Sequence, residues 1–79
     1  MANAYDLDIL LPRMGTRLKD LRLARKETLR SVAAKFHLSE ATLRKIEQGV
    51  YPKVKMTTLW GLTDYYQIPF RDLVVPDED

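Results

Sequence analysis

The amino-acid sequence predicts an all-α fold, a single compact domain of five helices covering residues 1–79. Two observations support this class. Apolar residues recur at intervals of three and four in successive segments, which is the spacing of one helix face. Helix start and stop residues flank the central segments, as Thr28, Ser39 and Gly49 show. A chain of 79 residues can build one small hydrophobic core.

The first helix is predicted in the N-terminal third. It should begin between Asp8 and Pro12, because proline is tolerated in a first turn, and end near Lys26. Residues 1–7 are expected to be a flexible N-terminus. The cluster Ile9-Leu10-Leu11 is wider than one apolar stripe, so it covers the domain's own core or contacts a second subunit. The stripe itself consists of Leu7, Leu11, Met14, Leu18 and Leu21.

Residues 28–49 are predicted to form two short helices joined by a tight turn. Thr28 can cap the first, and Ser39 can cap the second, which Gly49 ends. His37 stands where a helix often ends in a left-handed residue, a conformation that histidine tolerates. The apolar face of the first of these helices consists of Leu29, Val32, Ala33 and Phe36.

The helix of residues 39–48 has two unlike faces at 100° per residue. Leu43, Ile46 and Glu47 form a narrow inner face that must dock on other helices. The outer face is polar, with two cations at its centre, and consists of Glu40, Ala41, Arg44, Lys45 and Gln48. Composition alone favours an ordinary solvated surface here, whereas the spacing of caps and turn favours a binding face.

A loop and two helices are predicted after Gly49. Pro52 excludes helix from residues 50–55, and Lys53 and Lys55 point to the same side of this extended stretch. The next helix should start at a threonine cap, Thr57 or Thr58, and present an apolar face of Met56, Leu59, Leu62, Thr63 and Tyr66. The chain should end with a short helix within residues 68–75 and an acidic tail, residues 76–79.

Charge is distributed unevenly along the chain. Residues 13–55 carry twelve of the thirteen lysines and arginines against four acidic residues, whereas both flanking segments are net acidic. A basic centre of this kind is typical of proteins that bind a polyanion.

Composition excludes several classes of function. The chain has no cysteine and one histidine, which argues against disulfides, zinc sites and thiol catalysis. No glycine-rich phosphate loop is present, so we expect neither an enzyme nor a bound cofactor. No apolar run reaches membrane-spanning length and no leader-like segment is apparent, so a cytoplasmic protein is expected.

Residues 18–73 contain an ordered set of short motifs: Leu18-Lys-Asp-Leu-Arg22, Val32-Ala-Ala-Lys35, Leu38-Ser39, Thr42-Leu43, Ile46-Glu-Gln-Gly49, Leu59, Leu62 and Tyr66-Gln-Ile-Pro-Phe-Arg-Asp-Leu73. With this set the chain resembles the Cro and phage-repressor (XRE-type) helix-turn-helix family, whose domains have the five-helix fold of lambda repressor. In that family, the residues matching Arg22 and Glu47 form a salt bridge between the first helix and the recognition helix. The inward position of Glu47 supports this pairing independently, because an unpaired carboxylate on an apolar face would be costly.

The resemblance implies that helix 39–48 enters the major groove of double-stranded DNA. The expected base-contacting residues are Glu40, Ala41, Arg44 and Lys45. The expected phosphate-contacting residues are Arg30, Thr42, Tyr51, Lys53 and Lys55. Glu40 either accepts from cytosine N4 or favours the helix N-terminus electrostatically. Two features depart from the family: Leu29 replaces a usual glutamine, and Lys26-Glu27 replaces a usual Gly-apolar turn.

We therefore expect a sequence-specific DNA-binding transcriptional regulator, acting as a repressor. The alternative is a protein-interaction module that binds a partner protein, as in antitoxins that resemble this family. A homodimer is expected, since one recognition helix reads only a few base pairs. Its expected interface consists of Trp60, Tyr65, Phe70 and Val74.

Overall fold

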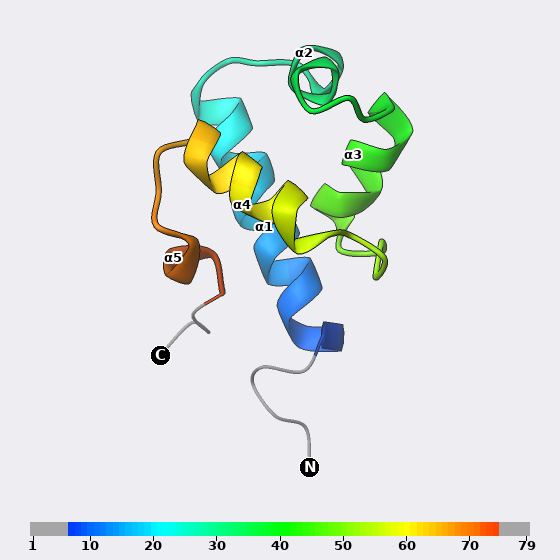
Figure 1. Cartoon of the computed structure of the whole chain (residues 1–79), viewed down its shortest axis with the longest axis vertical. Coiled ribbons are helices and arrows are strands. Elements are labelled where there is room, and N and C mark those ends of the chain that lie inside the picture. Colours follow the sequence, from blue (N-terminus) through cyan, green and yellow to red (C-terminus); the bar gives the residue numbers. More distant parts are fainter. Residues whose placement is uncertain (1–6, 75–79) are drawn as a thin grey trace.

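The computed structural model describes residues 7–74 and contains five helices and no strand within them. The predicted all-α class is therefore confirmed (Figure 1). The helices are α1 (Leu7–Ala24), α2 (Leu29–Lys35), α3 (Glu40–Gln48), α4 (Met56–Tyr65) and α5 (Phe70–Val74). Of the expected flexible N-terminus, only Leu7 is described, and α1 begins there; the expected acidic tail lies outside the described residues.

The N-terminal boundary of α1 differs from the prediction, and its C-terminal end lies two residues from the predicted Lys26. The helix starts at Leu7, so Pro12 lies inside it and not in its first turn. Pro12 has no N–H to donate to the carbonyl one turn earlier, but the helix continues past it. The helix ends at Ala24, short of Lys26, because Lys26 adopts a left-handed φ of 58°.

The first four helices all end in the same way. A left-handed residue follows each helix at Lys26, His37, Gly49 and Gln67, and only one of these is glycine. In each case the next residue donates its N–H to the carbonyl five positions earlier, as in a Schellman motif. These bonds are Glu27 to Arg22, Leu38 to Ala33, Val50 to Lys45 and Ile68 to Thr63. The chain therefore turns sharply after each helix.

Side-chain caps start the two central helices, and the predicted caps there are confirmed. Thr28 Oγ1 accepts from the N–H of Ser31, and Ser39 Oγ accepts from the N–H of Thr42. In α4 the predicted threonine cap is wrong. The cap residue is Lys55, with no side-chain hydrogen bond, because the helix starts at Met56, ahead of both threonines.

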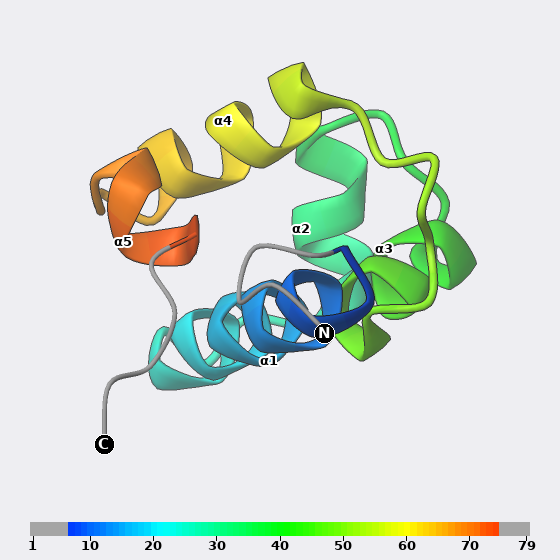
Figure 2. The ribbon, with the colours of Figure 1, turned by 90° about the horizontal axis from the view of Figure 1, so that it is seen from below.

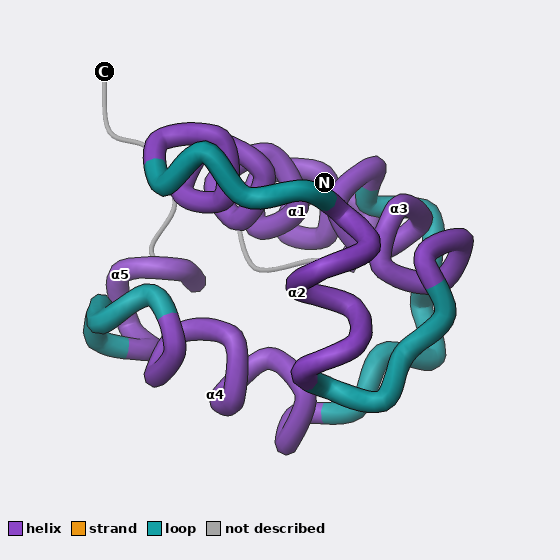
Figure 3. The backbone as a smooth tube through the Cα atoms, turned by 90° about the horizontal axis from the view of Figure 1, so that it is seen from above, coloured by secondary structure: helices purple, strands orange, loops and turns teal. Residues whose placement is uncertain are grey.

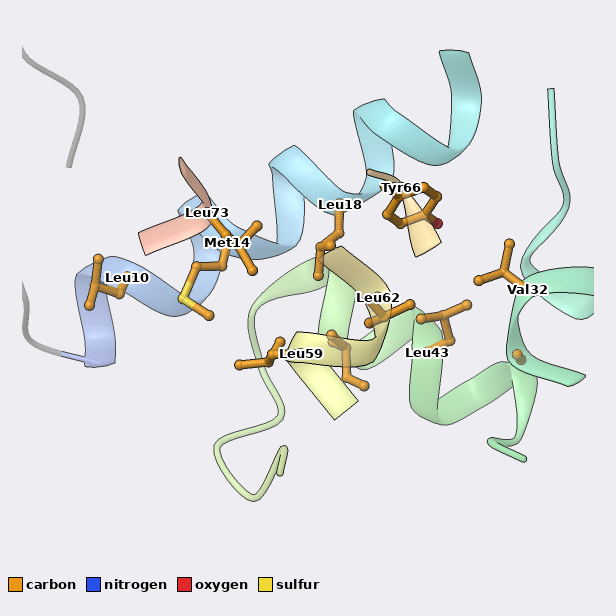
Figure 4. Packing of buried hydrophobic residues seen from close by; sticks show 11 residues of the cluster. Leu10, Met14, Leu18, Val32, Leu43, Leu59, Leu62, Tyr66 and Leu73 are labelled. Carbon is orange, nitrogen blue, oxygen red and sulfur yellow. The ribbon is translucent and has the colours of Figure 1, made fainter. Parts of the chain in front are cut away.

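The helices enclose one core that α1, α4 and α5 share with α2 and α3 (Figures 1 and 2). Figure 4 shows buried side chains of α1, α4 and α5 converging from different sides. Leu10 is in this core and Ile9 and Leu11 are half-buried, so the N-terminal cluster partly covers the domain itself. Met56 was expected in the core but is 54% exposed, because it occupies the first turn of α4. The core consists of Leu10, Met14, Leu18, Val32, Ala33, Leu43, Ile46, Leu59, Leu62, Tyr66 and Leu73.

A glycine allows α1 to lie directly on the C-terminal end of α3. Gly15 is buried, and a Cβ added to it would lie 2.5 Å from the carbonyl oxygen of Ile46 and closer still to that of Glu47. Gly49 shows the same constraint, since its Cβ would lie 2.5 Å from the nitrogen of Pro12. Backbone therefore meets backbone at this crossing, and no side chain separates the two helices.

We predict that Gly15→Ala destabilises the domain. In an ordinary helix interior, glycine to alanine gains up to about 1 kcal/mol. Here the added methyl must push α1 away from α3, an overpacking that costs about 1–3 kcal/mol. The free energy of unfolding from urea denaturation measures the difference.

Gly61→Ala, in α4, is the matched control. Its Cβ would lie 3.0 Å from the edge of the Phe36 ring, which can shift more readily than backbone. The free energy of unfolding should fall more for Gly15→Ala than for Gly61→Ala. A stabilised Gly15→Ala variant would contradict the close crossing.

Candidate nucleic-acid interface

The inner face of α3 is held against α1 by a buried ion pair. Arg22 Nε donates to Glu47 Oε2 at 2.9 Å, and Arg22 Nη2 donates to Glu47 Oε1 at 3.0 Å. The two side chains are only 8% and 4% exposed. The bond to Glu47 raises the pKa of Arg22 further above its ordinary value, so this charge is permanent. The bidentate geometry orients α3 relative to α1.

The same arginine reaches the turn between α1 and α2. Arg22 Nη1 donates to the backbone carbonyl of Glu27 at 2.9 Å. The hydroxyl of Tyr65, from α4, donates to the carboxylate of Glu27, and the guanidinium of Arg25 lies 4.6 Å from the centre of the Tyr65 ring. The Lys26-Glu27 turn is therefore fixed by α1 and α4, which positions the start of α2.

Tyr66 lies beside this network with a neutral hydroxyl. Burial raises the pKa of Tyr66 to about 12, and the negative charges of Glu47 and Glu27 act in the same direction. Within residues 7–74 its hydroxyl oxygen is buried without a hydrogen-bond partner. The group therefore places no second anion beside the Arg22–Glu47 pair at neutral pH.

The outer face of α3 is open to solvent. Ala41, Arg44, Lys45 and Gln48 are all exposed, and Glu40 is half-buried. Glu40 takes part in two ion pairs, at 3.0 Å with Arg44 and at 3.8 Å with Arg30 of α2. The four expected base-contacting residues thus lie on one helix, and three of them are exposed. The carboxylate of the fourth, Glu40, is already paired with two arginines.

A groove beside α3 collects most of the expected phosphate-contacting residues. It has a volume of about 610 Å³ and lies between the α2–α3 turn, α3 and the α3–α4 loop. Figures 2 and 3 show this loop running along the same side of the molecule as α3. Arg30 does not line this groove and stands on α2 with a 90% exposed side chain. The expected residues that line it are Thr42, Tyr51, Lys53 and Lys55.

A second hollow, on the other side of α3, includes residues that sequence reasoning missed. It has a volume of about 740 Å³, and Arg44 and Gln48 of α3 line it together with Thr16 and Lys19 of α1. Leu29, the departure from the family's glutamine, also lies there. Thr16 and Lys19 are three residues apart, so their shared position on one helix face was the available signal. Lysines therefore flank α3 on both sides, although Asp20 also lines the second hollow beside Lys19.

Of the four expected dimer residues, Phe70 adjoins both Trp60 and Val74, whereas Tyr65 lies elsewhere. Trp60 is 57% exposed and packs against Phe70, with ring centroids 5.6 Å apart. Phe70 and Val74 line an apolar groove of about 250 Å³ that extends to Leu10 and Leu11 of α1. Tyr65 instead points to the α1–α2 turn.

Five helices, two capped helices joined by a tight turn and an exposed polar face on the second of them define a helix-turn-helix domain. The chain belongs to the helix-turn-helix domain family, whose profile matches residues 13–74. Over 60 residues it is 35% identical to RghRB of Bacillus subtilis (strain 168), which is named an uncharacterized HTH-type transcriptional regulator. The match covers 76% of this chain and 43% of RghRB, so the chain spans less than half the length of that relative.

No solved structure matches the chain with statistical significance. Among the described helices, none is long and apolar enough to cross a membrane. Across residues 7–74, no three acidic, cysteine or histidine residues gather in an arrangement that could hold a metal ion.

We predict strong coupling between Arg22 and Glu47. Replacing either one with methionine leaves a buried charge without its partner, which costs roughly 3–5 kcal/mol. The double replacement should cost less than the sum of the two single ones, because it leaves no isolated charge. A double-mutant cycle from chemical denaturation gives the coupling energy, and a value near zero would contradict the role of the pair.

Proposed function

We propose that this domain is a sequence-specific double-stranded DNA-binding transcriptional regulator that represses by occupying its site. The family and the name of RghRB support regulation through DNA. The observation that carries the proposal is the contrast between the two faces of α3. Its inner face is locked by Arg22 and Glu47, while its outer face presents Arg44 and Lys45 to solvent.

The dimensions and chemistry of α3 suit the major groove of B-DNA. That groove admits one helix and displays donors and acceptors that differ for each base pair. Arginine and lysine make the commonest specific contact there, to guanine O6 and N7. We propose that the outer face of α3 reads bases while Lys53 and Lys55, in the adjoining loop, neutralise phosphates.

Replacing the cations of α3 and replacing those of the α3–α4 loop should therefore change DNA binding in different ways. Arg44→Ala or Lys45→Ala should cost about 1–3 kcal/mol on the preferred site and relax selectivity at particular base pairs. Lys53→Ala or Lys55→Ala should weaken all duplexes alike and reduce the salt slope by about one unit per lost phosphate contact. Binding titrations on a site selected from randomised duplex, compared with random duplex, separate the two effects.

Arg71→Ala is the matched control, since it removes one exposed cation from α5, on the opposite side of the molecule from α3 (Figure 1). Arg71→Ala should hardly change the affinity for either the selected site or random duplex. Equal losses for all four interface variants on every sequence would mean that α3 is only a basic patch. If none of the four interface variants changed DNA binding, the alternative of a module that binds a partner protein would replace the proposed function. The exposed side chains of Met56 and Trp60 support that alternative.

We also propose that the domain binds DNA as a homodimer. A single recognition helix reads a few base pairs, whereas a two-fold dimer places a second helix about one helical turn away. Trp60 packs against Phe70, which lines an apolar groove together with Val74, and these three residues offer an apolar surface for this contact.

Sedimentation analysis should show a dimer, at least on a palindromic site, and Trp60→Glu should shift it to monomer. The same variant should lose affinity for the palindrome but keep its affinity for a single half-site. A monomeric wild-type domain, both free and bound to a palindrome, would contradict the dimer.

A further inference from the structure

The carboxylate of Glu40 lies between two arginines at the start of α3. Its Oε2 is 3.0 Å from Arg44 Nη2, and its Oε1 is 3.8 Å from Arg30 Nε. The arginines come from different helices, α3 and α2, so the carboxylate bridges the two elements of the motif. All three side chains remain accessible, with 42% of Glu40, 49% of Arg44 and 90% of Arg30 exposed.

This arrangement reduces the positive charge of the surface that should meet DNA. One carboxylate is shared by two of the cations expected to contact the duplex. Lys45 has no such acidic partner among residues 7–74. Glu40 is the first residue of α3, and the N-terminal residues of a recognition helix meet the base edges. Its carboxylate therefore belongs to the surface that should face DNA.

An acid in this position interacts unequally with different duplexes. Phosphates, guanine O6 and N7, and thymine O4 are acceptors or anions and repel a carboxylate. The donors that the major groove can offer it are the amino groups of cytosine N4 and adenine N6. A duplex without such a donor beside Glu40 must bind against this repulsion and must also displace Arg44 or Arg30 from it.

We propose that Glu40 is a specificity-determining residue of this domain. Its carboxylate weakens binding to random duplex, both by engaging Arg30 and Arg44 and by repelling acceptors. It is tolerated where the opposing base donates an amino group. This inference rests on the proposed DNA-binding function and adds a selective role to one residue of the reading face.

A different account of Glu40 makes a different prediction. An acidic residue in a first helical turn, paired with arginine four positions later, also stabilises an isolated helix slightly. If that were its whole role, replacing Glu40 would lower the melting temperature a little and leave the preference between duplexes unchanged. Discrimination between sequences therefore separates the two accounts.

The test compares three variants of the whole chain with wild type on two duplexes, the site selected from a randomised pool and a random-sequence duplex. Glu40→Gln removes the charge and keeps the shape, and should tighten binding to random duplex about threefold to tenfold. It should tighten binding to the selected site less, so the ratio of the two affinities falls. Repeated selection with Glu40→Gln should no longer exclude guanine and thymine at one position, because the glutamine amide can donate a hydrogen bond as well as accept one.

Two controls keep this result interpretable. Glu40→Asp retains the charge and should keep most of the discrimination. Asp64→Asn changes the net charge equally at an exposed position on α4, away from α3, and should tighten binding to random duplex less than Glu40→Gln. Circular dichroism melting of each variant verifies that the fold is intact.

The outcomes are distinguishable. If Glu40→Gln leaves the affinity ratio unchanged, or if Asp64→Asn has the same effect, the selective role of Glu40 is overturned while DNA binding stands. If wild type binds neither duplex between about 50 and 200 mM salt, the proposed function fails and this inference fails with it.

Discussion

The orientation of α3 depends on a buried ion pair acting together with a close helix crossing. Arg22 and Glu47 form a bidentate bond with almost no exposure to solvent. A buried ion pair of this kind is weak evidence for net stability, since its desolvation offsets much of the attraction. It does penalise every arrangement of α3 that separates the charges. Gly15 adds a second constraint at the C-terminal end of α3, where backbone contacts backbone.

These constraints bury the inner face of α3 against the rest of the domain and leave its outer face open to solvent. Sharp turns after α1, α2 and α3 keep the flanking helices away from that face, and the α3–α4 loop brings Lys53 and Lys55 beside it. The first two turns are made at Lys26 and His37, where the left-handed conformation is uncommon for a residue other than glycine. The network of Arg22, Glu27 and Tyr65 holds the first of them.

The parts of the fold that local signals specify could be predicted from sequence. The Thr28 and Ser39 caps and the stop at Gly49 act within one helical turn, so neighbouring residues suffice to define them. The inner face of α3 follows from its 3.6-residue period. The predicted starts of α1 and α4 were wrong, because a proline or a side-chain cap favours a helix start without requiring one. Pro12 is accommodated inside α1, and α4 starts at Met56, ahead of its threonines and without a side-chain cap. The role of Gly15 and the pairing of Glu40 with Arg30 are contacts between helices, which no single segment encodes.

The central claim is that α3 lies in the major groove, and methylation interference on the selected site tests it most directly. Dimethyl sulfate methylates guanine N7, in the major groove, and adenine N3, in the minor groove. The account predicts that methylated guanine N7 within the site blocks binding, whereas methylated adenine N3 does not. Interference confined to adenine N3, or binding unaffected by either modification, would contradict it.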